Sequence, residues 1–98
     1  MTQPTKPLFI PLKREWFEAF ERGEKTVEYR AFGPGWNSTT CRPGRAVVLS
    51  FGYSGRRLSA NIECLELLSP EAAPKVAAEF FPGKVIAAIH LRDIRPLA

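Results

Sequence analysis

The period of the apolar side chains changes early in the chain, and each change predicts a different element. Residues 8–12 are apolar and β-prone apart from Pro11, which predicts a short strand at a sheet edge or with a bulge. In residues 13–22 apolar side chains recur every four positions and charged side chains fill the other face, so we expect an amphipathic helix. Gly23 follows at the position where a left-handed residue commonly ends a helix.

Strict alternation of apolar and polar side chains begins at Thr26. Val27 and Tyr29 face one side of the predicted strand. Thr26, Glu28 and Arg30 share the opposite side. The strand is therefore expected to have one apolar face and one face of charged and hydroxyl groups.

The middle of the chain predicts a long loop followed by a β-hairpin. Residues 31–45 are rich in Gly, Pro, Asn, Ser and Thr, and a loop of this length often has a function. Residues 46–51 and 58–67 are predicted to be the two strands, with a turn signal at residues 54–55. The apolar phase slips near Cys64, which indicates a bulge in the second of these strands.

A second helix and a last strand complete the predicted fold. Ser69 and Pro70 are typical of an N-cap and a first helical position, so we expect a short helix that ends near Phe80. Residues 84–94 predict a strand, and its apolar face consists of Val85, Ala87, Ile89 and Leu91. Short strands and two short helices around one small core indicate an α+β fold, a partly open β-barrel.

Composition fits a single globular domain. The chain has 98 residues with 45% apolar and 24% charged side chains, which leaves room for one core. We expect residues 1–7 to be a flexible N-terminal tail and residues 8–98 to be the domain. No apolar run approaches the length of a membrane span, and residues 1–7 lack the features of a signal peptide. A cytoplasmic monomer is therefore the expectation.

Cysteine spacing and net charge limit the ligands and partners that the chain is expected to bind. Cys41 and Cys64 have no CxxC spacing and no nearby histidine, so we expect two free thiols, no metal and no cofactor. The net charge is +4, and nine of the fourteen basic residues are arginine. This balance favours acidic partners, since the planar guanidinium suits phosphate groups.

The segment from Gly23 to Arg30 carries a recognisable pattern. It has the form GxKxxExR directly after the predicted amphipathic helix. This pattern resembles the signature of the ASCH family, whose members have a PUA-like barrel, and the predicted order of strands and helices agrees with that family along nearly the whole chain. The resemblance implies a small PUA-like β-barrel with a cleft beside the motif that binds RNA or nucleotides.

Some ASCH proteins are amidohydrolases that act on N4-acylated cytidine with a lysine, a threonine and a glutamate. The resemblance places the lysine at Lys25, whereas Glu28 stands where those enzymes have threonine. Thr26 shares the strand face of Glu28 and offers a hydroxyl near Lys25, and Glu63 is a candidate third group. Two hypotheses follow: a module that binds RNA, a nucleotide or a nucleoside, and a small amidohydrolase with Lys25, Thr26, Glu28 and Glu63 as its catalytic set.

The charged triplet also has a purely physical interpretation. Lys25 is expected at the mouth of the strand as a mobile point charge, and Glu28 and Arg30 are two residues apart on one face, where a carboxylate can orient a guanidinium toward a ligand. The alternative is an exposed ion pair that contributes up to about 1 kcal/mol to stability.

Further binding residues are expected in the loops. Trp36 is expected either to stack on a base or to close the end of the barrel as part of the core. Arg45 and Arg56 are candidates for a rim that contacts phosphates, although a solvated turn is the simpler interpretation at Arg56. The expected ligand-binding set is Lys25, Glu28, Arg30, Trp36, Arg45 and Arg56.

Overall fold

Five strands and two helices make up the part of the chain that the computed structural model describes, residues 6–53 and 55–97. Their bounds are β1 Leu8–Leu12, α1 Arg14–Glu21, β2 Val27–Ala31, β3 Ala46–Phe51, β4 Arg57–Leu68, α2 Lys75–Phe80 and β5 Ile86–Pro96. Residues 1–5 of the expected tail and Ser54 of the expected turn lie outside the described residues.

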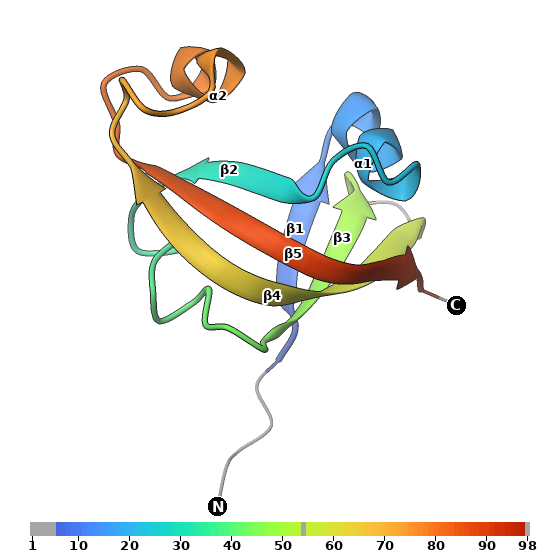
Figure 1. Ribbon diagram of the computed structural model, residues 1–98. Helices are drawn as coiled ribbons and strands as arrows, with labels where there is room; N and C mark the ends of the chain where they lie inside the picture. The colour runs from blue at the N-terminus through green and yellow to red at the C-terminus, as the bar shows by residue number, and fades with distance from the viewer. Residues whose placement is uncertain (1–5, 54, 98) are drawn as a thin grey trace, which may run out of the picture.

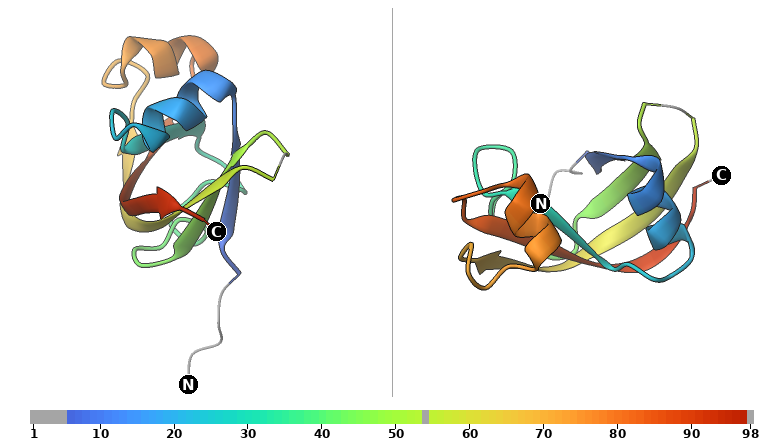
Figure 2. Two further views of the ribbon diagram at one scale, coloured as in Figure 1. Left: turned by 90° about the vertical axis from the view of Figure 1, so that its right-hand side faces the viewer. Right: turned by 90° about the horizontal axis from the view of Figure 1, so that it is seen from above.

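The strands form one curled sheet in the order β1-β3-β4-β5-β2 (Figure 1). β1 pairs with β3 in parallel, and every other neighbouring pair is antiparallel. The position of β1 at a sheet edge confirms the prediction from Pro11, whose missing N–H excludes it from central strands. The sheet curls into a half-barrel, so the predicted α+β fold, a partly open β-barrel with two short helices, is confirmed. Figure 2 shows both helices at the same end of this half-barrel.

The first helix packs its aromatic side chains into the concave side of the sheet. Phe17 and Phe20 are fully buried there with the inward-facing apolar residues of the strands. The helix ends as predicted, because Gly23 adopts a φ of +79°, a conformation that costs glycine little. The chain reverses at this point and enters β2.

The second helix begins later than the sequence indicated. Ser69 does accept hydrogen bonds, at its Oγ from the Ala72 N–H (3.2 Å) and at its carbonyl from the N–H groups of Ala72 and Ala73 (both 3.0 Å). This single turn does not continue, because Pro74 disfavours a helical conformation at the residue before it. Helix α2 starts after Pro74, and the prediction of a helix start at Ser69 was therefore wrong.

The last strand is shifted by two residues from its predicted range. Val85 lies before β5 and is 45% exposed, so its expected inward position was wrong. Residues 86–89 are all buried, which means that both faces of this part of β5 are covered. The expected alternation therefore fails where the strand is central in the sheet.

Two irregularities interrupt the pairing of β4 with β5. The register shifts between Ile62 and Cys64, which confirms the predicted bulge and leaves Glu63 as the additional residue of β4. A second shift lies near the other end of β5, where Asp93 has a φ of +56°. These bulges determine which side chains of β4 and β5 share a face.

Candidate functional site

A cavity of about 710 Å³ opens between α1, β2, α2 and the end of β1. Figure 2 shows β2 passing between the two helices when the molecule is seen from above. The lining residues are Pro11, Leu12, Lys13, Trp16, Ala19, Glu24, Lys25, Glu28, Tyr29, Arg30, Ala31, Trp36, Pro74, Val76, Ala77, Phe80 and Phe81. Its walls are thus largely aromatic and aliphatic, and the predicted triplet of charged side chains is among them.

The charged side of β2 faces inward. Glu28 is only 7% exposed, whereas Val27 and Tyr29 on the other face are half-buried. Pairing with β5 sets Glu28 opposite Ile89 and Arg30 opposite Ala87, and both partners are fully buried. The small side chain at Ala87 lets the long side chain of Arg30 extend over the sheet.

Arg30 is held by three contacts. Its Nε donates to Oε2 of Glu28 (2.8 Å), and its Nη2 donates to the carbonyl oxygen of Pro11 (2.8 Å). The guanidinium also lies over the ring of Trp36, with Cζ 4.8 Å from the ring centroid. Within the described residues Nη1 has no hydrogen-bond partner, so a fixed guanidinium presents free donors to the cavity.

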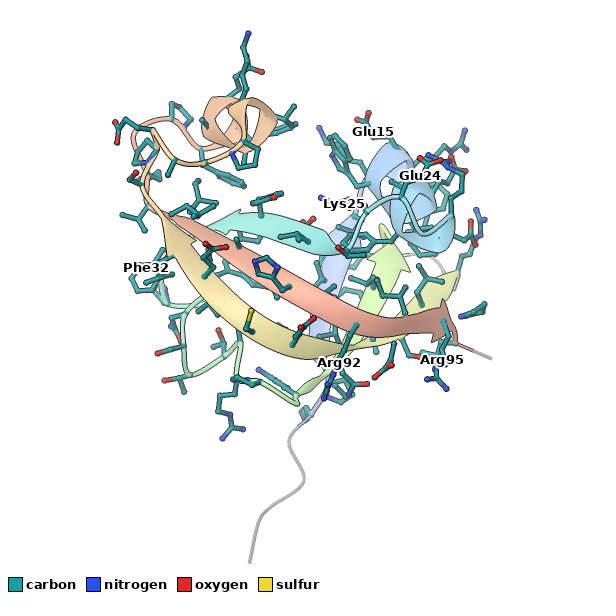
Figure 3. All side chains as sticks on the ribbon, in the orientation of Figure 1. Glu15, Glu24, Lys25, Phe32, Arg92 and Arg95 are labelled. Atoms are coloured by element: carbon teal, nitrogen blue, oxygen red, sulfur yellow. The ribbon has the colours of Figure 1, made fainter. Side chains whose placement is uncertain are left out.

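The Lys25 ammonium is surrounded by three aromatic rings. Nζ lies 5.4 Å from the ring centroid of Trp16, 5.3 Å from that of Phe20 and 5.1 Å from that of Tyr29. Figure 3 shows the side chain between α1 and β2. Lys25 is therefore not the mobile surface charge that we expected, because cation–π contacts hold it in place.

Glu28 lies between the two cations. Its Oε1 is 3.7 Å from Nζ of Lys25, a distance too long for a direct hydrogen bond, while Oε2 binds Arg30. Burial lowers the pKa of Lys25, the carboxylate of Glu28 opposes this shift, and the positive charge of Arg30 adds to it. The cluster therefore combines a desolvated ammonium, an oriented guanidinium and a carboxylate oxygen that can accept a further hydrogen bond.

The expected packing of Trp36 against the core is confirmed in part, and its stacking on a base stays a prediction. The ring lines the cavity and also packs against the edge of the hydrophobic core. Its loop is anchored by paired backbone hydrogen bonds between Gly33 and Trp36, of 3.2 and 3.1 Å. The Asn37 side chain binds the backbone of the same loop on both sides. A loop without helix or strand is thus fixed well enough to position an aromatic wall.

Two residues of the expected catalytic set lie outside the cavity. Thr26 has an exposed side chain and does not line it, although its carbonyl oxygen accepts from the Leu91 N–H (2.9 Å). Glu63 is the additional residue of the β4 bulge, and its side chain is exposed on the sheet. The structure therefore brings together Lys25 and Glu28 but not these two.

The two outer arginines of the expected set also lie elsewhere. Arg45 donates to the carbonyl oxygens of Thr40 (2.6 Å) and Lys6 (2.9 Å), so it ties the loop to the start of the chain. Arg56 pairs with Glu21 at 2.6 Å, on the outside of α1. Neither guanidinium lines the cavity.

Aromatic walls are the part of the site that sequence patterns missed. The helical period predicts Trp16 only as part of the apolar helix face, although its ring borders both the cavity and Lys25. Phe80 and Phe81 close the side formed by α2, and Lys13 lies over the Phe80 ring at 5.3 Å. The sequence signal for this wall is the pair of adjacent aromatic residues, Phe80 and Phe81, directly before a proline and a glycine.

The side chains that commonly bind metal ions are not clustered in residues 6–53 and 55–97. No group of three or more His, Cys, Asp or Glu side chains there could hold a metal ion. Cys41 is buried and Cys64 is exposed, and both are free. None of the helices in this part of the chain has the length and apolarity needed to cross a bilayer.

Comparison with solved structures identifies the fold. No family model matches the sequence, and no curated protein matches it. The structure is similar to the crystal structure of a mutant of ZmASCH from Zymomonas mobilis, with a TM-score of 0.67. The similarity covers 90% of this chain and 68% of the other, at 20% sequence identity. Together with the half-barrel of five strands and two helices, it makes this chain an ASCH-like domain in its fold.

Proposed function

We propose that the cavity binds a single nucleotide unit, either a free nucleotide or nucleoside or one residue of an RNA strand. One observation carries this proposal: Lys25, Glu28 and Arg30 place donors and an acceptor side by side in a cavity with aromatic walls. The edge of a nucleobase has the complementary arrangement of amino donors and carbonyl or ring-nitrogen acceptors.

The dimensions and walls of the cavity support this ligand class. A volume of about 710 Å³ lies in the range of small-molecule sites, which is roughly 300–1,000 Å³. Trp16, Trp36 and Phe80 offer flat surfaces for a planar base. With two cations and one carboxylate, the cluster keeps one net positive charge, which favours a phosphate at the entrance.

Binding can be measured by tryptophan fluorescence or calorimetry with cytidine, cytidine monophosphate and adenosine monophosphate. We expect saturable binding that Lys25→Met and Arg30→Gln each weaken at least tenfold, a loss of about 1.4 kcal/mol for a charge-assisted hydrogen bond. Lys84→Gln removes one positive charge outside the cavity and should bind like the wild type. Absence of binding, or equal effects of all three substitutions, would contradict the proposal.

A salt titration separates base recognition from phosphate recognition. Cytidine has no phosphate, so its affinity should change little with salt, whereas that of the monophosphate should fall as salt rises. If neither nucleoside nor nucleotide binds at low salt, the nucleotide hypothesis fails for this cavity.

One observation favours the amidohydrolase hypothesis, namely that burial lowers the pKa of Lys25. A larger neutral fraction would let the amine accept a proton from water. The water oxygen would attack the acyl carbonyl of N4-acetylcytidine, and the bond between the acyl carbon and N4 would break. The Lys25 ammonium would return the proton to N4, so that cytidine and acetate form. Formation of cytidine by the wild type but not by Lys25→Met supports this reaction, and equal traces of cytidine from both would exclude it.

A further inference from the structure

A second positively charged surface lies on the convex side of the sheet. Its members are the outward-facing side chains of β4 and β5, which we call the outer arginine face: Arg57, Ser59, Asn61, Arg92 and Arg95. Leu58, Ala60 and Ile62, which alternate with the β4 members, are buried in the core. None of the five lines the cavity. Figure 3 shows Arg92 and Arg95 beside the far end of β5, well away from Lys25.

The bulge at Asp93 creates this surface. In a regular strand Arg92 and Arg95, three residues apart, would point to opposite faces of the sheet. The observed register instead sets Arg92 opposite Asn61 and Arg95 opposite Ser59, so three steps of β5 match two steps of β4. The additional residue is accommodated by the φ of +56° at Asp93, and both arginines therefore point outward.

An aromatic pair borders the outer arginine face. Phe9 lies in the same row, because the register joins Phe9 to Val48 and Val48 to Ser59. The Tyr53 ring stacks on Phe9 at a centroid distance of 5.9 Å, and Tyr53 is 83% exposed. The guanidinium of Arg57 lies over the Phe9 ring, with Cζ 5.4 Å from the ring centroid. Arginines and exposed aromatic rings thus meet on one open sheet surface.

The geometry points to a second binding site here, in which the outer arginine face and Tyr53 bind a single-stranded nucleic acid. The arginines would contact successive phosphates, and Tyr53 would stack on a base. Ser59 and Asn61 add small hydrogen-bonding groups between the arginines. An acidic protein would need the charges but not the exposed ring, and a membrane surface would need inserted apolar side chains, which this row lacks.

The carboxylate of Asp93 acts against such a ligand. Oδ2 of Asp93 lies 3.8 Å from Nε of Arg92, and both side chains are more than half exposed. The residue that shapes the bulge therefore also reduces the local positive charge. Asp93→Asn removes this negative charge, and asparagine also tolerates a positive φ. The substitution should therefore tighten nucleic-acid binding.

The site is independent of the ligand proposed for the cavity, and the test keeps the two apart. Fluorescence anisotropy of a labelled oligouridylate of about ten nucleotides, a length within the usual range of site sizes, is measured over a salt series. The double variant Arg92→Gln/Arg95→Gln removes two predicted phosphate contacts. Its control, Lys75→Gln/Lys84→Gln, removes two charges from exposed positions on and after α2.

We expect a linear fall of log affinity with log salt concentration. The arginine double variant should reduce the steepness of this line by about 1.4, since each single-strand phosphate contact contributes about 0.7. The lysine double variant should leave the slope unchanged. Tyr53→Ala should weaken binding at least about fivefold, as expected for loss of one stacked base. Asp93→Asn should bind more tightly than the wild type.

Cytidine monophosphate binding by Arg92→Gln/Arg95→Gln reports on the cavity alone and should equal that of the wild type. If the wild type binds oligouridylate but not cytidine monophosphate, only the cavity proposal is overturned. The outer site is overturned if oligouridylate does not bind, or if both double variants have the same salt slope. It is also overturned if polyglutamate or vesicles with phosphatidylserine bind as tightly as the RNA with the same dependence on the two arginines.

Discussion

Oε2 of Glu28 and Nε of Arg30 are 2.8 Å apart, and the two side chains are only 9% and 21% exposed. This proximity fixes the guanidinium in the cavity and balances part of the positive charge around it. Two positively charged neighbours depend on the same carboxylate, because Lys25 lies 3.7 Å from its other oxygen.

Replacing Glu28 by glutamine should therefore destabilise the fold by about 1–3 kcal/mol, the usual cost of losing a buried hydrogen bond to a charged group. Urea denaturation measures the free energy of unfolding. Glu24→Gln is the control, since Glu24 pairs with Arg22 on the exposed surface and such pairs contribute about 1 kcal/mol or less. Equal losses in the two variants would mean that the buried cluster adds nothing to stability.

The free energy of unfolding should depend on the protonation of Lys25 in alkaline solution. Its pKa in the folded state is lowered, mainly by burial, whereas an unfolded lysine titrates near the usual value of about 10.4. Between these two values the unfolded chain binds more protons than the folded one, so stability rises with pH through that window. The cost of burying the charge remains at lower pH, where both states are protonated.

Lys25→Met should remove this rise, and the difference between wild type and variant across the alkaline range is the measured quantity. Comparison with the variant is needed because burial raises the pKa of Tyr29, which makes stability fall with pH above about 10. A difference curve without slope would show that the ammonium is not desolvated in the folded protein.

The positive φ of Asp93 predicts opposite outcomes for two substitutions. Valine at this position should destabilise the protein by about 1–2 kcal/mol, because a β-branched residue strongly disfavours the left-handed region. Glycine should be neutral or mildly stabilising, since it adopts a positive φ without the steric cost of a Cβ atom. Thermal denaturation of Asp93→Val and Asp93→Gly decides this, and Arg92→Val provides a neighbouring exposed control. Equal effects of valine and glycine would argue against the bulge.

Substitution of two phenylalanines should distinguish effects on stability from effects on nucleotide binding. Phe17 is fully buried, so Phe17→Ala should cost about 3–5 kcal/mol of stability. Phe80 is 51% exposed in α2, so Phe80→Ala should cost less than about 1 kcal/mol. Because Phe80 lines the cavity, its removal should nevertheless weaken nucleotide binding in the fluorescence assay. Unchanged affinity would indicate that α2 does not contact the ligand.

Local periodicity explains which parts of the fold were predictable. The helix around Phe17 and the charged face of β2 follow from spacings within one element, and the structure confirms both. The predicted start of α2 was wrong because it rested only on the helix-start signal at Ser69 and Pro70. The conformational restriction that Pro74 imposes on its neighbour had the larger effect.

The site was predictable only in its charged centre. The GxKxxExR spacing identified Lys25, Glu28 and Arg30, which do meet in the cavity. The aromatic contacts of Lys25 could not be predicted, because they depend on how α1 packs over β2 rather than on any single pattern. Arg56 was misplaced for the same reason, since its partners on α1 lie far from it in sequence.

The place of β2 in the sheet has a consequence for the order in which the protein is assembled. β2 is an edge strand whose sheet neighbour is β5, the last element of the described chain. During synthesis β1, β3 and β4 can pair as soon as they leave the ribosome, whereas residues 27–31 wait for the C-terminal strand. The nascent chain can therefore form part of its scaffold before β2 completes the cavity.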